Sequence, residues 1–582
     1  MAEGDPTNAD IARALDEVGD LYELDGAVSH RVLAYHTGAQ SVRESSASVA
    51  QLAREGRATE LPGIGATLQE KILALTENGE IPAAVELHKR WPAGVLDVTR
   101  LPGIGAKRAR LFYTELGIAS TDELRAAAEN QALRHLKGVG PKMEEAILQA
   151  LERRTGDDGR ERILASRALA IAEEVAAALE AACGKGVRAT PAGSVRRRTE
   201  TVADIDMIAT GPDPAAITRA FCELDLVERA ESSGELAARV VLHSGTAVDL
   251  RVGDEARHGN LLQHFTGSAA HNTALRERAV KEGLHVSEYG IRGDRADRLE
   301  LFATEAEVYR RLGMDYIEPE LRENRGELDA AREGTLPALV SLADLRGDLH
   351  THTTASDGQA SIAEMAAAAK ALGHEYLAIT DHSATHGFGN DVSPEQLERQ
   401  IELVREANER IEGIELLAGS EVNILPDGKL DYADDLLARL DWVVASIHTA
   451  FKASARAMTD RMLAAIGHPL VDAIGHPTGR LIGKRPPYEL ELGRVFAAAA
   501  ETGTALEINS SPNRRDLSEI DARAASQAGV RFVIDSDAHR EATLANLQWG
   551  VATARRAWLG ADAILNALPL DALRASRPRA RG

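Results

Sequence analysis

The chain has 582 residues, 44% of them apolar and 27% charged, which is typical of globular proteins and predicts several domains rather than one core. The net charge of −23 gives no support by itself to nucleic-acid binding, for which phosphate attraction is the main source of affinity. The sequence has no long apolar run, no apolar N-terminal stretch and only two cysteines (Cys183, Cys222), which argues against a membrane span, a secretory signal and a disulfide framework and favours a cytoplasmic protein.

Three similar segments occur in the first 150 residues: LPGIGATLQEKI from Leu61, LPGIGAKRARLF from Leu101 and LKGVGPKMEEAI from Leu136. Two glycines one residue apart permit a tight turn, and the following helix offers free backbone N–H groups to a phosphate oxygen. A single such turn is more often plain punctuation between helices, but three copies favour helix-hairpin-helix binding to the DNA backbone.

Basic residues follow the second and third repeats. Residues 81–200 hold 20 Lys and Arg against 16 Asp and Glu, so this stretch is locally positive. We therefore expect DNA contacts from the repeat glycines and nearby lysines: Gly63, Gly65, Gly103, Gly105, Lys107, Gly138, Gly140 and Lys142.

The segment ADIDMIA predicts a strand on which Asp204 and Asp206 share one face. Carboxylates held this close repel each other unless a cation lies between them. The strand pair in ARVVLHSGTAVDLRV presents a third acid, Asp249, among apolar residues. An Asp-x-Asp pair alone is more often a solvated strand edge, but Gly193-Ser194 and three arginines precede it and suit triphosphate oxygens. Together they predict two Mg²⁺ or Mn²⁺ ions for phosphoryl transfer.

GSVRRRTETVADID and HFTGSAAHN resemble the nucleotide-binding signatures of family X DNA polymerases. The resemblance implies that Asp204, Asp206 and Asp249 are metal ligands and that Asp249 activates the primer 3′-hydroxyl. His264 replaces the usual tyrosine of the sugar-checking pair, which bears on the rejection of ribonucleotides, and Ala269 replaces a residue that is often polar. The residues implied to bind the deoxynucleoside triphosphate or the template are Gly193, Ser194, Arg197, His264, Phe265, Gly267, Asn272 and Arg276.

The first repeat, with RVLAYHTGA before it, is similar to the small N-terminal domain of polymerase-beta-like enzymes. This implies a Schiff-base role in deoxyribose-phosphate lyase chemistry for Lys71. Thr67 and His36 depart from the basic residues common in those relatives, and an exposed helix lysine is an equal alternative.

Beyond residue 343 the pattern changes to short apolar runs that alternate with helical stretches, which predicts βα units. Six of seven runs (DLHTH, YLAITDH, LLAGSE, VVASIH, DAIGH, ALEIN, FVIDSDAH) finish on His, Asp or Glu, and in βα-barrels chemistry gathers at such strand ends. The ring of ligands this predicts is His350, His352, Asp357, His382, Glu421, His448, His476, Asp537 and His539. Nine ligands are too many for one ion and indicate two or three Mn²⁺, Zn²⁺ or Fe²⁺.

The nine positions resemble the motifs of the PHP phosphoesterase family. This resemblance implies a distorted seven-stranded barrel with a trinuclear site that hydrolyses a phosphodiester, with Asp381 and Arg480 supporting the ligands.

We therefore predict a multidomain α+β and α/β protein. It has helical helix-hairpin-helix domains, a nucleotidyltransferase palm with a mixed sheet, and a C-terminal distorted seven-stranded (β/α) barrel. The predicted boundaries are an N-terminal helical domain at 1–85, a fingers-like domain at 86–155, the palm at 156–255, a nucleotide-selecting subdomain at 256–320, a flexible linker at 321–343 and the PHP domain at 344–582.

The combined interpretation is a family X polymerase that fills gaps in DNA repair, with 3′–5′ exonuclease activity in the barrel. Its expected partners are gapped or nicked DNA, deoxynucleoside triphosphates and a ligase or other repair protein, at the nucleoid and not at a membrane. Three alternatives remain open: a barrel that acts on small phosphate esters, a barrel that is a structural brace, and a front half that only docks on DNA.

Overall fold

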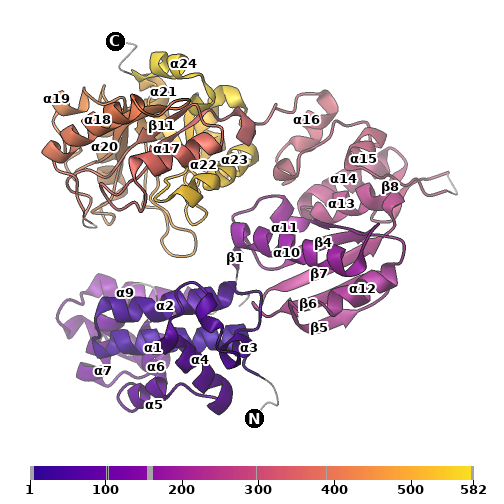
Figure 1. Cartoon of the computed structure of the whole chain (residues 1–582), viewed down its shortest axis with the longest axis horizontal. Coiled ribbons are helices and arrows are strands. Elements are labelled where there is room, and N and C mark those ends of the chain that lie inside the picture. The colour runs from indigo at the N-terminus through magenta and orange to yellow at the C-terminus, as the bar shows by residue number, and fades with distance from the viewer. Residues whose placement is uncertain are drawn as a thin grey trace. The chain divides into compact units, whose positions relative to one another are not determined.

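A computed structural model describes residues 5–99, 101, 104–153, 162–295, 298–387 and 390–578. Figure 1 labels the helices and strands of the chain. The fold divides into two compact units. The first comprises Met1–Ile163, Ala170–Pro191 and Ala203–Glu255, and the second comprises Leu164–Leu169, Ala192–Val202 and Ala256–Gly582. β1 (Ile163–Leu164) and α10 (Ala165–Cys183) each belong in part to both. Within the described ranges, no helix has both the length and the apolar character that a bilayer span needs.

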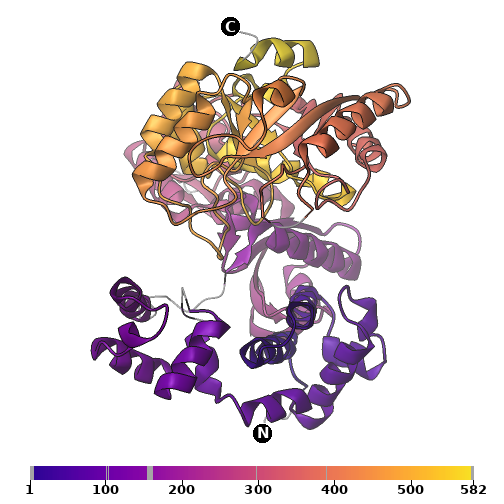
Figure 2. The ribbon, with the colours of Figure 1, turned by 90° about the vertical axis from the view of Figure 1, so that its left-hand side faces the viewer.

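The first unit begins with a helical region (Figure 2). Its helices have polar ends and apolar inner faces: Thr7 caps the first helix in a capping box, and Leu15, Leu21 and Leu24 on that helix are buried. The helices are α1 (Asn8–Asp25), α2 (Ser29–Glu44), α3 (Val49–Arg54), α4 (Ala66–Asn78), α5 (Pro82–His88), α6 (Ala93–Thr99), α7 (Ala106–Leu116), α8 (Thr121–Glu129) and α9 (Pro141–Arg153).

The same unit contains a five-stranded mixed sheet, as predicted, with α12 (Pro214–Cys222) packed on it. The central strands β4 and β7 are parallel and the other pairs are antiparallel. In sheet order the strands are β2 (Arg188–Pro191), β4 (Ile205–Thr210), β7 (Ala247–Gly253), β6 (Ala237–Leu242) and β5 (Val227–Ser233).

The second unit starts with a small helical subdomain around its own apolar cluster, which includes Leu275, Tyr309 and Ile317. Its elements are α11 (Gly193–Arg196), β3 (Thr201–Val202), α13 (His258–Thr266), α14 (Ala269–Lys281), β8 (Leu284–Ser287), β9 (Gly290–Gly293), α15 (Glu305–Arg311) and α16 (Glu327–Glu333).

The segment predicted to be a flexible linker differs from that expectation. Leu321, Leu328 and Ala331 are buried in the core of the helical subdomain, and Val340 is buried in the core of the barrel. A connection whose apolar side chains are buried at both ends is part of the packed structure, so residues 321–343 join the two cores.

Seven parallel strands form the nearly closed barrel that was predicted. A bridge between Thr351 and Ala538 brings the last strand end to the first. Neighbouring residues of a strand join different apolar clusters, Leu416 and Ala418 in one and Leu417 in the other, as a period of two requires. The strands are β10 (Gly347–Thr351), β11 (Tyr376–Ile379), β12 (Glu415–Asn423), β13 (Trp442–Ser446), β14 (Ala473–Ile474), β15 (Ala505–Asn509) and β16 (Phe532–Asp535).

Helices surround the strands in both ribbon views (Figures 1 and 2). Several begin with a serine that caps the first turn, as Ser361 and Ser393 do through capping boxes. The helices are α17 (Ile362–Ala371), α18 (Pro394–Asn408), α19 (Asp434–Leu437), α20 (Ala455–Ile466), α21 (Leu492–Thr502), α22 (Glu519–Gln527), α23 (Leu547–Arg556) and α24 (Leu570–Ser576).

Candidate metal centres and nucleotide site

The three carboxylates predicted from the sequence come together on the mixed sheet. Asp206 and Asp249 are register partners on the parallel strands β4 and β7. Asp204 lies two residues before Asp206 and therefore on the same face. A carboxylate triplet at adjacent strand positions is an oxygen-rich site of the kind that Mg²⁺ and Mn²⁺ prefer.

Arg239 on β6 faces this triplet. Its guanidinium forms an ion pair with Asp249, its strand partner, and lies 3.8 Å from Asp204. Burial raises the pKa of Asp249, Arg239 lowers it, and Asp204 raises it again, so that the pKa stands above its usual value. A carboxyl group with a raised pKa is suited to accept a proton.

The residues predicted to bind the nucleotide lie in the second unit. Gly193 and Ser194 open α11, and Arg197 ends it. His264 and Phe265 lie in the last turn of α13, with ring centroids 4.8 Å apart. Gly267 has φ +71°, and a Cβ there would lie 3.1 Å from Arg197 Nη1, so this position excludes a larger residue.

Two further predicted residues follow on α14. Asn272 donates to the carbonyl of His264 at 2.6 Å and accepts from Gln263 at 2.9 Å. Arg276 Nε donates to the carbonyl of Asn272 at 3.2 Å. These bonds fix the shape of the segment, and the contacts of Asn272 and Arg276 with substrate stay predictions.

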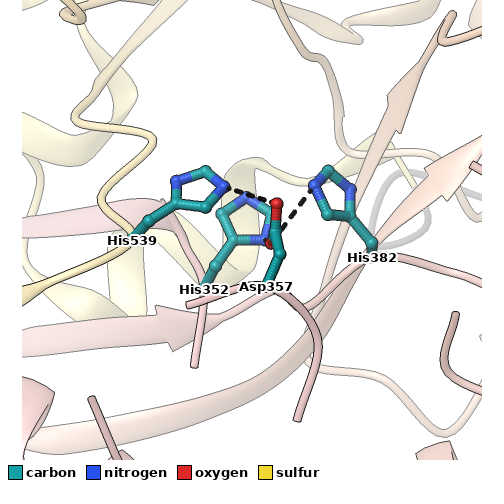
Figure 3. Close-up of side chains that lie close together, drawn as sticks. All are labelled: His352, Asp357, His382 and His539. Atoms are coloured by element: carbon teal, nitrogen blue, oxygen red, sulfur yellow. Dashed lines mark ion pairs between the residues drawn. The ribbon is translucent and has the colours of Figure 1, made fainter. Parts of the chain in front are cut away.

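All nine ligands predicted for the barrel converge at the carboxyl ends of its strands. Asp357 lies 3.3 Å from His539 and 3.6 Å from His382, with His352 beside it (Figure 3). A second group contains His350, His352 and Asp537, and a third contains His382, Glu421 and His448. His476 joins them through a 2.9 Å contact with Glu421.

Glu421 is at the centre of the cluster. Its carboxylate is buried and lies 2.7 Å from His382, 3.1 Å from His448 and 3.5 Å from His350. Burial raises the pKa of Glu421, but the surrounding histidines outweigh burial and hold the pKa well below its usual value. A buried carboxylate shared by several imidazoles is suited to bridge two cations.

Atoms in the cluster that make no hydrogen bond indicate what the site is for. Both oxygens of Glu421, both nitrogens of His352 and Nε2 of His350 are buried without such a bond. Unsatisfied polar atoms cost free energy in a protein interior, so a group of them that face one another fits a bound cation. The donor set of imidazoles and carboxylates suits divalent transition metals.

The protonation of the histidines fits the same conclusion. Burial, His382 and His539 lower the pKa of His352 to about 4, so that it is a neutral imidazole ready to bind. Burial lowers the pKa of His382, but the carboxylates of Glu421 and Asp357 outweigh burial and raise the pKa to about 10. Cations bound between these groups would take the place of such protons.

The glycines predicted to bind DNA occupy turns that precede helices, as the sequence indicated. Gly65 and Gly105 cap α4 and α7, Gly63 and Gly138 have φ of +76° and +84°, and a Cβ at Gly65, Gly105, Gly138 or Gly140 would meet open space. Such a surface leaves room for a DNA backbone. Lys107 is exposed on α7, while Gly103 and the side chain of Lys142 lie outside the described residues. Lys71 is half-buried on α4.

Comparison with known proteins adds independent evidence. Family models match a helix-hairpin-helix domain at residues 6–81 and a tandem of such motifs at 95–153. The DNA polymerase beta thumb matches residues 261–323, and the PHP domain matches residues 348–511. The DNA polymerase/3′–5′ exonuclease PolX of Bacillus subtilis is 36% identical over 565 residues, which are 96% of this chain and 97% of that protein.

The chain belongs to the PolX family of DNA polymerases. The predicted resemblance to family X with a PHP domain is thereby confirmed. Both metal-binding halves of this PolX family member consequently use divalent cations. Relatives of the barrel alone include probable phosphatases of Thermoanaerobacter sp. (32% identical, 38% of this chain, 89% of the relative) and Shewanella sp. (34%, 39% and 89%).

Sequence analysis of this PolX family member missed Glu507. Its Oε1 lies 2.7 Å from His350 Nδ1, and its other oxygen accepts from the backbone N–H of His476. Glu507 is buried on β15 between Leu506 and Ile508, so an acid within an apolar strand was the available signal. Hydrogen bonds of this kind orient metal-binding imidazoles.

The two predicted supporting residues have different outcomes. Asp381 accepts from Thr353, Ser356 and Gln400 and thereby fixes the loop that carries Asp357, as expected. Arg480 was expected to support the predicted ligands, but its guanidinium pairs with Glu200 at 2.6 Å. A carboxylate that lies within reach of an arginine side chain fixes the position of its guanidinium, however far apart the two residues are in the sequence.

Proposed function

We propose that this chain is a DNA-directed DNA polymerase that fills short gaps during repair and removes nucleotides from 3′ ends in its barrel. The pairing of Asp206 with Asp249 on adjacent strands, with Asp204 on the same face, carries the proposal for synthesis. The clustering of nine ligands supports the hydrolytic activity.

In synthesis, Asp204, Asp206 and Asp249 would hold two Mg²⁺ or Mn²⁺ ions, which supply charge stabilisation for in-line phosphoryl transfer. The Asp249 carboxylate would accept the proton of the primer 3′-hydroxyl. The hydroxyl of Ser194 and the residue at the end of the same turn, Arg197, would bind the triphosphate. Phe265 and the bare backbone of Gly267 would lie against the sugar.

In hydrolysis, the nine barrel ligands would hold two or three Mn²⁺, Zn²⁺ or Fe²⁺ ions, which supply a nucleophile at neutral pH and polarise the phosphate. Glu507 would fix the ring of His350 and the backbone of His476. His539 and Asp357 lie at the more open side of the cluster, where a DNA 3′ end could enter.

The hairpin repeats support gapped or nicked DNA as the substrate, because backbone binding is indifferent to sequence. The filled product is a nick, which a ligase or another repair protein would then seal. Such an enzyme would work in the cytoplasm, at the nucleoid.

A second candidate activity for the barrel is hydrolysis of small phosphate esters. The names of the probable phosphatases that match the barrel favour it. A small phosphomonoester offered beside a 5′-labelled DNA strand separates the two, since the leading proposal requires faster release of nucleotides from DNA.

The test uses a duplex with a one-nucleotide gap, Mn²⁺ and deoxynucleoside triphosphates, and follows both extension and shortening of the primer. Asp204→Ala/Asp206→Ala should lose synthesis and keep trimming of the 3′ end. His350→Ala/His352→Ala should lose trimming and keep synthesis.

Two matched controls lie outside both sites: Asp225→Ala removes an exposed acid, and His468→Ala removes a barrel histidine paired with Asp434. Both should retain both activities. Trimming that survives the histidine changes would refute the nuclease assignment and leave the phosphatase or brace interpretation.

A further inference from the structure

Arginines of the barrel bind the turn that carries Ser194. Arg515 follows β15, and its Nη2 and Nη1 donate to the carbonyl oxygens of Arg198 and Thr199 at 3.0 and 2.8 Å. Its third nitrogen, Nε, donates to the hydroxyl of Thr553 on α23 at 2.8 Å. Every nitrogen of this guanidinium therefore has a fixed partner, and two of the three partners belong to the turn.

Arg556 at the end of α23 completes the contact. Its Nη1 donates to the carbonyl of Arg197 at 2.7 Å, and its other nitrogens pair with Glu519 and Glu323. Three consecutive carbonyls, those of residues 197, 198 and 199, thus each accept an N–H from the barrel. Arg480 adds an ion pair with Glu200, the next residue.

Burial makes these contacts specific. Arg515 is 1% exposed and Arg556 is 4% exposed. Burial lowers the pKa of the Arg515 guanidinium to about 10, which reflects the cost of removing its charge from water. A buried charge is stable only with its hydrogen bonds in place, so the side chain and the turn fix each other.

The backbone on both sides of the contact is unusual. Arg198 has φ 56° and Arg515 has φ 46°, in the left-handed region that side-chain-bearing residues seldom adopt. Conformations of this kind persist where their surroundings over-determine them and are common at functional sites.

The helical subdomain holds the same turn from its own side. Arg196 pairs with Glu305 through two bonds, and Arg197 donates to the carbonyl of Thr266 at 2.6 Å. Glu323 lies 3.1 Å from both Arg197 and Arg556, so one carboxylate links the two sets of contacts.

We infer that Arg515 and Arg556 of the barrel are positioning residues for nucleotide incorporation. They act through the backbone of Arg197–Thr199 and hold Ser194 where the triphosphate binds. The inference rests on the proposed polymerase function and extends it, because it makes the barrel a structural part of the polymerase's nucleotide site. The barrel's own metal centre takes no part in this role.

The experiment measures single-nucleotide incorporation by the full chain on gapped DNA, with kcat and KM for the nucleotide determined separately. Arg515→Met should raise KM by about tenfold with a smaller change in kcat, because a displaced turn weakens nucleotide binding while the carboxylates are untouched. Exonuclease activity of the same variant should stay within about twofold of wild type and shows that the barrel is folded.

Arg555→Met is the matched control. Arg555 neighbours Arg556 on α23 but pairs with Glu320 and not with the turn. Its KM should not change. Arg515→Lys, which can reach one carbonyl but not two at once, should give an intermediate KM.

If the wild type incorporates nucleotides and both Arg515→Met and Arg556→Met keep the wild-type KM, the inference is wrong. Absence of incorporation by the wild type would instead refute the proposed function. If Arg515→Met loses both activities through misfolding, Arg556→Lys decides. It keeps a charge for Glu519 but cannot also reach the Arg197 carbonyl, so a raised KM supports the inference and an unchanged one overturns it.

Discussion

Glu507 and His350 face each other inside the barrel, with Oε1 of the acid 2.7 Å from Nδ1 of the imidazole and both side chains buried. The other imidazole nitrogen, Nε2, points towards Glu421 and Asp537. One nitrogen of His350 is therefore fixed by the protein, which leaves the opposite nitrogen for a cation.

Glu507→Gln should reduce the affinity of the barrel site for metal without changing the positions of the surrounding side chains. The amide can still bond His350, but it carries no charge to raise the basicity of the imidazole. We expect a loss of about 10–100-fold in exonuclease rate or metal affinity, measured by metal analysis and 3′-end trimming. Exposed Glu501 on α21 provides the control Glu501→Gln, and equal losses in both variants would contradict a specific role.

Gly358→Ala tests the glycine beside Asp357. A Cβ there would lie 2.7 Å from the backbone of His352 and Thr353, so the ligand loop must shift. We expect destabilisation by about 1–3 kcal/mol in chemical denaturation, together with loss of bound metal. Gly493→Ala, where a Cβ meets open space in α21, should leave stability equal or higher. If Gly358→Ala binds as much metal as the wild type, the added Cβ does not displace the loop that carries Asp357.

Acid should loosen the contact between barrel and turn. Burial raises the pKa of Glu519, but the Arg556 guanidinium outweighs it and sets the pKa at about 2, against 4.5 for a free glutamate. A carboxyl group whose pKa is lower in the folded state than in the unfolded state stabilises the fold at any pH above the unfolded-state pKa. That stabilisation is lost as the pH falls from about 5 to about 2. The difference corresponds to roughly 3 kcal/mol.

Unfolding measured from pH 7 to pH 3 should therefore show a steeper loss for wild type than for Glu519→Gln. The variant should also be less stable at pH 7, because Arg556 loses its main partner. Identical slopes for the two proteins would show that Glu519 is not the titrating group.

The lyase hypothesis for Lys71 has a direct chemical readout. A Schiff base between Lys71 and an abasic sugar is reduced by borohydride to a stable adduct, which peptide mass spectrometry can place. Lys71→Arg should abolish the adduct, whereas Lys89→Arg, at an exposed lysine on the same region of chain, should not. An adduct on other residues alone would remove Lys71 from the catalytic set.

The convergence of the predicted barrel ligands could be expected from the sequence, because they stand at or near the ends of apolar runs. His350, Glu421 and Asp537 each belong to such a run, and parallel strands bring these ends to one edge. Glu507 belongs to no motif and was missed, although the sequence shows it between two apolar residues, Leu506 and Ile508.

The connection between the two cores was harder to predict. Residues 321–343 have no periodic apolar pattern, and their order depends on partners such as Arg556 for Glu323, more than 200 residues away. Sequence reasoning relies on local periodicity, and contacts at such separations leave no local signal.

Arg514 and Arg515 are consecutive, yet the first lies 3.9 Å from Asp537, a predicted metal ligand, and the second donates to the carbonyls of Arg198 and Thr199. A shortened chain that ends near residue 343 would lose these supports, so weak synthesis by such a fragment would reflect a displaced turn rather than defective chemistry. For the same reason, recombination that exchanges barrels between relatives should succeed only when the donor brings arginines that match the recipient's turn.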